Sequence, residues 1–119
     1  MKRIGAAIAA GALLFAANPA AAWERITTEQ QFVDEVAGRT IFNAAGSSWV
    51  LHPDGRLVGT WDGHSMTGRW EWHQAFLCRN VRIGGSESGT DCQIIEVQGD
   101  RVRITRDQGR GEASEVSMR

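Results

Sequence analysis

Apolar and polar residues alternate along most of the chain from residue 39 onward, which is the pattern of β-strands with one buried face. Turn-forming groups, such as those at 53–55, 62–63 and 99–100, interrupt the alternation, and most of them lie nine to thirteen residues apart. Short strands at this spacing are typical of an antiparallel sandwich or barrel. The predicted strands, up to eight of them, lie at residues 39–44, 47–52, 56–61, 65–72, 76–83, 90–98, 101–107 and 112–118.

The lengths of the turns predict how neighbouring strands pair. We expect a three-residue loop at 53–55, a two-residue turn at 62–63 and a three-residue loop at 73–75. A wider turn at 62–63 is an alternative that leaves the same residues on each face. Opposite partners and residues two apart share a face of a sheet, so one face collects a mostly apolar set that we expect to form a dry interior. Its members are Trp49, Leu51, Leu57, Gly59, Trp61, Met66, Gly68, Trp70, Trp72, Phe76 and Cys78.

The unit Gly-x-Trp occurs twice on this face, ending at Trp61 and at Trp70. Each glycine lies two positions before its indole, so it shares the face and leaves the ring room to pack. Core packing is therefore the first interpretation, and an exposed aromatic platform for a sugar, lipid or peptide is the second. If a ligand enters the fold, we expect its path to be lined by Trp61, Trp70, Trp72 and Phe76.

The two cysteines, Cys78 and Cys92, predict one structural disulfide, because an even number in an exported chain is typical of a disulfide framework. The bond would close a loop of about 15 residues and contribute roughly 3 kcal/mol. A redox-active pair is the alternative, but it prefers a Cys-x-x-Cys spacing that is absent here. We expect both sulfur atoms to face the interior.

An inward Cys92 creates a conflict further along its strand. It requires Ile94 to point inward as well, whereas pairing across the turn at 99–100 places Ile95 on the apolar face. A β-bulge near these two isoleucines would reconcile the predictions, because an extra residue reverses the alternation. Otherwise one isoleucine packs beneath the N-terminal helix.

Residues 28–37 have a helical pattern. Thr28 and Gln31 form a capping-box sequence, and Phe32 and Val36 fall on one face. A helix this short is marginal alone, so we expect it to dock that face on the sheet. The predicted fold class is mainly β: an N-terminal helix with an eight-stranded antiparallel meander or small barrel and one disulfide.

The first 22 residues have the pattern of a cleaved bacterial signal peptide. Two basic residues precede an apolar run at 4–17, and small residues follow at 20–22. The run of about 14 residues is shorter than the roughly 20 that a membrane-spanning helix needs. We therefore expect export to the periplasm, a single domain at 23–119 and no membrane span after cleavage, with eukaryotic secretion as the alternative.

Composition and motifs argue against several function classes. Without residues 1–22 the chain has 11 basic and 14 acidic residues, and this net charge of −3 disfavours nucleic-acid binding. Neither Gly-x-Ser-x-Gly nor Gly-x-Gly-x-x-Gly occurs, so we expect no such serine nucleophile and no cofactor. We also expect no metal, although His52, His73 and Asp54 could share one rim of a meander, with His64 at the other end.

The run GRWEWHQAFLCRN at 68–80, followed by DCQ at 91–93, resembles a group of small exported bacterial proteins of unknown function. The residues that carry the resemblance are Gly68, Trp70, Trp72, Cys78, Arg79, Asp91, Cys92 and Gln93. Some members are labelled dihydrodipicolinate reductase, but this chain has neither the length nor the glycine fingerprint of a nicotinamide-binding fold, so that activity is not carried over. More loosely, the expected fold is similar to small lipocalin-like barrels, which include periplasmic protease inhibitors.

The sequence shows no catalytic constellation, so the expected function is non-catalytic binding of a protein partner or a small apolar ligand. One alternative is a small enzyme with Arg79, Glu71 and the histidines in a rim pocket. Another is an envelope stability or assembly factor acting through an exposed strand edge.

Overall fold

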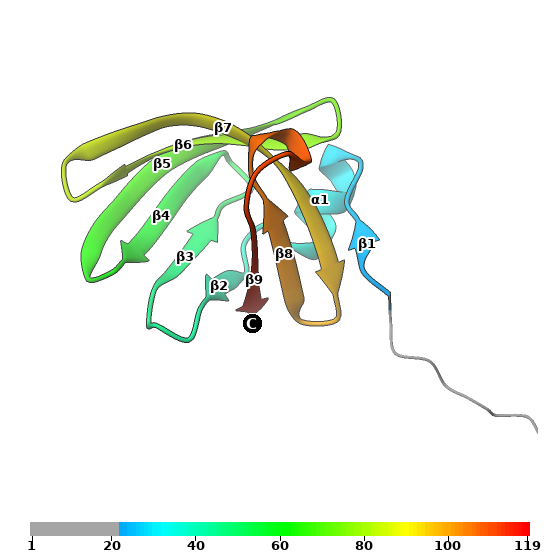
Figure 1. Cartoon of the computed structure of the whole chain (residues 1–119), viewed down its shortest axis with the longest axis horizontal. Helices are drawn as coiled ribbons and strands as arrows, with labels where there is room; N and C mark the ends of the chain where they lie inside the picture. The colour runs from blue at the N-terminus through cyan, green and yellow to red at the C-terminus, as the bar shows by residue number, and fades with distance from the viewer. Residues whose placement is uncertain (1–21) are drawn as a thin grey trace, which may run out of the picture.

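The computed structural model describes residues 22–119; residues 1–21, and with them all but the last residue of the predicted signal peptide, lie outside this part. The described residues form nine strands and one α-helix, which are joined by short connections (Figure 1). They are β1 (Glu24–Arg25), α1 (Glu29–Glu35), β2 (Thr40–Phe42), β3 (Ser48–Leu51), β4 (Arg56–Trp61), β5 (His64–His73), β6 (Phe76–Ile83), β7 (Ser86–Gln98), β8 (Arg101–Thr105) and β9 (Ala113–Met118), with a 3₁₀ turn, η2 (Asp107–Gly109), before β9. Within residues 22–119 no helix has the length and apolar character needed to cross a lipid bilayer.

The strands β2 to β9 form a closed antiparallel barrel. Each pairs with the next along the chain, and β2 also pairs with β9, with Ile41 opposite Met118. The fold class is therefore confirmed, and of the two predicted architectures the barrel is the one observed. All eight predicted strands are present, whereas β1 was not predicted.

Strand β7 is the longest of the described strands and pairs with three other strands. Its first part pairs with β6, and its last part pairs with β8 on one side and with the short β1 on the other, where Glu24 lies opposite Val97. In Figure 1, β7 runs along the top of the barrel and then bends down beside β8. Strand β1 thus continues the line of β6 along β7 and brings the chain to α1.

The predicted pairing of β3, β4 and β5 is confirmed. Leu51 lies opposite Leu57, and Trp61 pairs with His64 across a two-residue turn. Both turn residues have positive φ, 53° at Asp62 and 83° at Gly63, as the favoured tight hairpin turn requires. Trp61 and Trp70 consequently face the same side of the sheet, toward the barrel interior.

The predicted three-residue loop between β5 and β6 is wrong. His73 pairs directly with Phe76 across a two-residue turn, in which Gln74 adopts a φ of 58°. This shift by one residue reverses every side chain of β6. Phe76 and Cys78 therefore face outward, and Leu77 and Val81 are the buried residues, at 3% and 5% exposure.

The disulfide is confirmed, but its predicted orientation is not. Cys78 lies directly opposite Cys92 and is bonded to it, on the outer face of the barrel. An outward Cys92 places Gln93 and Ile95 inside, so the conflict at Ile94 and Ile95 disappears without the predicted bulge. The register shift between β6 and β7 lies instead beside Gly89, which has a φ of +74°.

Helix α1 packs across one end of the barrel. Thr28 Oγ1 accepts a hydrogen bond from Gln31 N at 3.1 Å, as the predicted cap requires, and the helix ends two residues earlier than predicted. The fully buried Phe32 contacts Trp70 edge-on at 4.9 Å and stacks with Trp72 at 5.4 Å between ring centroids. Because Trp72 lies next to the last residue of β5, Phe32 fills the barrel end where the β5–β6 turn lies.

The glycines of the two Gly-x-Trp units allow neighbouring strands to approach closely. A Cβ at Gly59 would collide with the backbone carbonyl oxygen of Ser48 and with Trp49, and a Cβ at Gly68 would collide with the carbonyl oxygen of Asn80. The obstacle is therefore mainly the adjacent strand rather than the indole two positions away, which was the predicted reason. Glycine at these points suits the strong bend of a small barrel.

Candidate functional site

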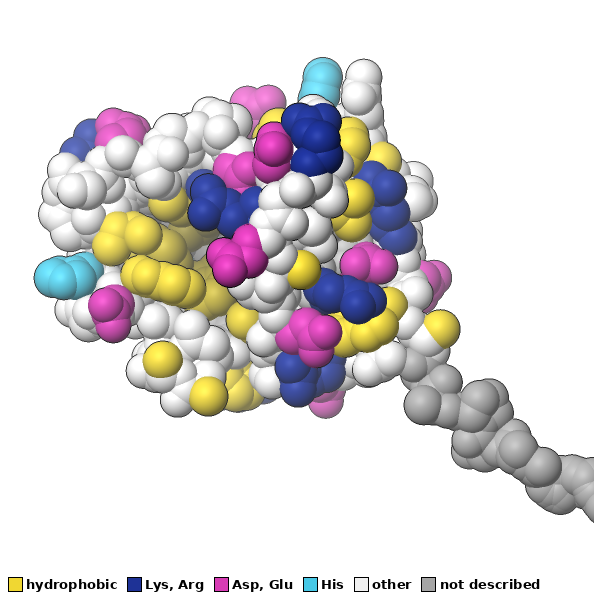
Figure 2. Space-filling view, in the orientation of Figure 1, with side chains coloured by type: hydrophobic (Ala, Val, Ile, Leu, Met, Phe, Trp, Pro, Cys, Tyr) yellow, Lys and Arg dark blue, Asp and Glu magenta, His cyan; other side chains and the backbone are white. Residues whose placement is uncertain are grey.

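The barrel end opposite α1 contains a cavity of about 370 Å³. Trp61 at the end of β4, Ile83 at the end of β6 and Arg106 just after β8 mark its mouth. Figure 2 shows this hollow, with hydrophobic side chains gathered on one margin and basic and acidic side chains on the other. The apolar lining consists of Trp49, Leu57, Trp61, Met66, Val81, Ile83, Ile104 and Val116.

Two indoles form the aromatic wall of the cavity. Trp49 and Trp61 have ring centroids 5.7 Å apart and planes tilted by 57°. Trp61 is 40% exposed; within residues 22–119 the exposed large hydrophobic residues are Trp61 and Val58. Small-molecule sites are usually concave and lined predominantly by hydrophobic and aromatic side chains, as this cavity is.

Arg79 introduces a positive charge into this interior. It lies on β6 between the buried residues Leu77 and Val81, opposite Asp91 of β7. Its Nη1 atom is buried and has no hydrogen-bond partner within residues 22–119. Burial lowers the pKa of Arg79, with the Asp91 charge opposing and the Arg106 charge adding to this effect. The guanidinium is nevertheless protonated at neutral pH.

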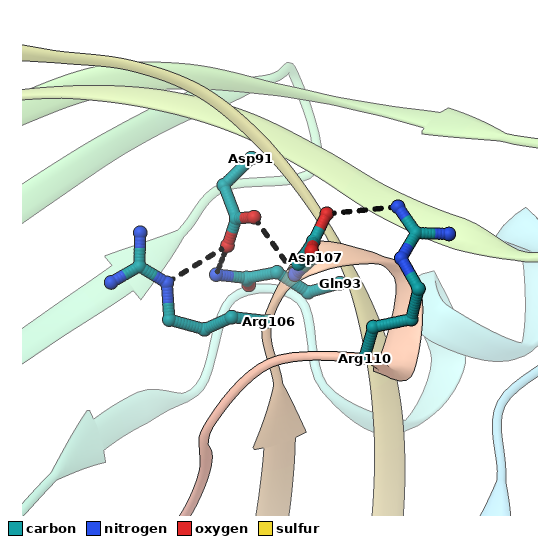
Figure 3. A network of polar contacts seen from close by, with 5 residues as sticks. All are labelled: Asp91, Gln93, Arg106, Asp107 and Arg110. Carbon is teal, nitrogen blue, oxygen red and sulfur yellow. Dashed lines mark hydrogen bonds and ion pairs between the residues drawn. The ribbon is translucent and has the colours of Figure 1, made fainter.

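Asp91 is already occupied by other partners (Figure 3). Its Oδ2 accepts hydrogen bonds from Gln93 Nε2 at 2.8 Å and Arg106 Nε at 3.3 Å, and its Oδ1 accepts one from the backbone N–H of Asp107 at 3.0 Å. Burial raises the pKa of Asp91, but these three hydrogen bonds and the charge of Arg79 together lower it by more than burial raises it. The pKa therefore lies below its usual value. The carboxylate therefore anchors the β8–β9 connection to β7.

The β8–β9 connection forms one side of the mouth. Asp107 and Gln108 both have positive φ, 54° and 56°, and Arg110 Nη2 pairs with Asp107 at 3.0 Å. Arg106 N donates to Glu112 O at 3.0 Å, which closes the connection at its base. Through Arg106 and Glu112 this connection supplies two of the charged side chains that line the cavity.

The four aromatic residues predicted to line a ligand path lie in three different places. Trp61 lines the cavity. Trp70 and Trp72 pack against Phe32 at the closed end, where Trp70 Nε1 donates to His52 O at 2.8 Å. Phe76 faces outward beneath the Arg25 guanidinium, 5.3 Å from its ring centroid. The structure therefore brings only Trp61 of this set to the cavity.

Trp49 and Arg79 belong to the cavity but were not among the predicted ligand-path residues. Trp49 was assigned to the interior by its alternation with Leu51, so the signal for it was present. The predicted inward position of Cys78 placed its neighbour Arg79 on the outer face, and this error came from the incorrect β5–β6 loop. The apolar character of its neighbours Leu77 and Val81 was the signal that could have placed it inside.

The residues of the enzyme alternative do not converge. Glu71 lies opposite the outward Cys78, whereas Arg79 faces the interior, so the two are on opposite sides of the sheet. His52 and His73 lie at the end closed by α1, away from the cavity. In the part of the chain that the structure describes, no group of three or more histidine, cysteine, aspartate or glutamate residues could hold a metal ion.

Comparison with known proteins gives no relative: no protein-family model, no curated protein and no solved structure matches the chain.

Proposed function

We propose that this protein binds a small, largely apolar molecule in the cavity at the open end of its barrel. The observation that carries the proposal is the cavity of about 370 Å³, which is lined mostly by apolar side chains and has the exposed Trp61 at its mouth. This volume lies in the range of roughly 300–1,000 Å³ that is usual for small-molecule sites. The opposite end is filled by Phe32, so a ligand would enter from one side only.

Ligand binding is favoured over the two alternatives by the arrangement of residues 22–119. Glu71 and Arg79 face opposite sides, which does not support the enzyme alternative. Each of the eight barrel strands has a neighbour on both sides, so the barrel offers no long free edge for an assembly factor.

The proposal includes the periplasm as the place of action. The Cys78–Cys92 disulfide supports an oxidising compartment, and the pattern of residues 1–22 supports export. Fractionation of cells that express the whole chain with a C-terminal tag tests this part. Recovery of a shortened chain in the periplasmic fraction is expected, and a full-length chain in the cytoplasm would contradict it.

The test of binding uses 1-decanol, an uncharged single-chain probe, in isothermal titration calorimetry with parallel measurement of tryptophan fluorescence. We expect saturable binding and a change in emission. Trp61→Ala should weaken binding about tenfold or more, because it removes one wall of the cavity. Val58→Ala is the matched control, since Val58 is equally exposed at 40% on the same strand but faces outward. Absence of saturable binding, or equal losses in both variants, would refute the proposal.

A further inference from the structure

We propose that the ligand of this cavity is a single-chain amphiphile whose anionic head group, a carboxylate, is bound by Arg79. This inference rests on the proposed function and specifies the chemical class of the ligand.

Arg79 lines the cavity, is partly buried, and has a hydrogen-bond donor without an acceptor in residues 22–119. The side chain enters the interior between Leu77 and Val81, and its Nη1 atom is buried without a partner in the described residues. A buried donor on a charged group is costly when it has no acceptor. An oxygen atom from a ligand would supply the missing acceptor, and a carboxylate would also supply the opposite charge.

The nearby carboxylates of the protein do not supply the missing acceptor. Asp91 lies directly opposite Arg79, but its two oxygen atoms accept from Gln93, Arg106 and the backbone of Asp107. Arg106 and Asp91 form an ion pair at 3.3 Å, so these two charges are matched to each other. Among residues 22–119, Glu112 is the one carboxylate residue that lines the cavity; it is exposed, and its repulsion of an anion is therefore weakened by water.

The charged residues of the cavity come from only part of its lining. The charged lining residues are Arg79 on β6 and Arg106 and Glu112 in the β8–β9 connection. The side that β3 and β4 contribute is apolar and consists of Trp49, Leu57 and Trp61. Figure 2 shows the same division, with hydrophobic side chains on one margin and charged ones on the other. A molecule with one anionic group and an apolar chain matches this division.

The size of the cavity limits the length of that chain. At about 30 Å³ for each heavy atom, the share of a water molecule in the liquid, a cavity of about 370 Å³ holds about 12 heavy atoms. Decanoate has ten carbon and two oxygen atoms. A carboxylate is also among the smallest anionic head groups, so it leaves the most room for an apolar chain.

The experiment compares decanoate, 1-decanol and decylamine by isothermal titration calorimetry at pH 7.5, below the concentrations at which they form micelles. In the unmodified protein we expect decanoate to bind about tenfold or more tightly than 1-decanol, and decylamine to bind most weakly. Arg79→Met should remove the preference for decanoate over 1-decanol. Arg79→Lys keeps the charge but loses the planar fork, so an intermediate preference is expected.

Arg82→Met is the matched control. Arg82 lies three positions further along the same strand, faces outward and pairs with Glu87 at the surface, so its removal should leave the preference for decanoate unchanged. Thermal unfolding of each variant shows that it is folded, and Arg79→Lys carries the comparison if Arg79→Met does not fold.

The outcomes separate this inference from the proposed function. Equal affinity for decanoate and 1-decanol in the unmodified protein would overturn the role of Arg79 while leaving apolar ligand binding in place. A preference for decanoate that persists in Arg79→Met, or that is lost equally in Arg82→Met, would also overturn it. Failure of all three probes to bind would overturn both proposals.

Discussion

Replacement of Phe32 by alanine tests the packing of α1 on the barrel. Phe32 is fully buried and contacts the rings of Trp70 and Trp72. An aromatic side chain buries about 150–250 Å², and at about 25 cal/mol per Å² this corresponds to several kcal/mol. Allowing for the methyl group that alanine retains and for the cavity left behind, we expect the free energy of unfolding to fall by about 3–5 kcal/mol.

This loss is large compared with the total stability of about 5–15 kcal/mol that is usual for one domain. Urea denaturation followed by tryptophan fluorescence measures it, and near-ultraviolet circular dichroism reports the loss of order around the two indoles. Phe32→Leu keeps most of the volume and should cost about 1–2 kcal/mol, so it serves if Phe32→Ala does not fold.

The control is Gln30→Ala on the exposed side of the same helix, where Gln30 makes one surface hydrogen bond, to Asp34 Oδ1 at 2.9 Å. Its change in the free energy of unfolding should stay within about 0.5 kcal/mol. A cost below about 1 kcal/mol for Phe32→Ala, or equal costs for the two variants, would show that α1 does not close the barrel in the way described.

Three further predictions concern the framework around the site. Replacing both Cys78 and Cys92 by alanine should lower the free energy of unfolding in urea by about 3 kcal/mol, because the bond spans 14 positions of sequence. Gly68→Ala should cost about 1–3 kcal/mol in the same assay, since the added Cβ meets the carbonyl oxygen of Asn80. The pKa of Asp91 is lower in the folded state, so its carboxylate stabilises the fold above about pH 4, the unfolded value. That contribution should be lost as pH falls through the folded pKa, and unfolding curves of Asp91→Asn should lack this component.

The part of the fold that the sequence predicted best lies around turns whose residues require a special backbone conformation. Asp62 and Gly63 both adopt positive φ, which is why an Asp-Gly pair predicts a two-residue hairpin turn and a definite register. The pairing of β3, β4 and β5 followed from such turns. The closure of β2 on β9 did not, because the two strands are distant in sequence and no local signal records their contact.

The turn between β5 and β6 shows why the rest could not be predicted in the same way. It contains no glycine, and its first residue, Gln74, adopts a positive φ that glutamine seldom takes. The length of the turn was therefore not visible, and an error of one residue reversed all of β6. The same error produced the apparent conflict at Ile94 and Ile95, since Cys92 is bonded to a residue of that strand.

The candidate site depends on long-range contacts that the local sequence of the Gly-x-Trp units does not predict. Trp61 and Trp70 have the same local sequence pattern, yet Trp70 lies beneath Phe32 and is 4% exposed, whereas Trp61 lies at the mouth and is 40% exposed. The docking of a helix from another part of the chain decides which of them can meet a ligand. Arg79 breaks the alternation of β6, because it is a charged residue at an interior position. A charged residue inside a barrel opposes folding unless it has a partner. Such conflicts between sequence patterning and structure are expected at functional or strained sites, and the proposed ligand would supply the missing partner of Arg79.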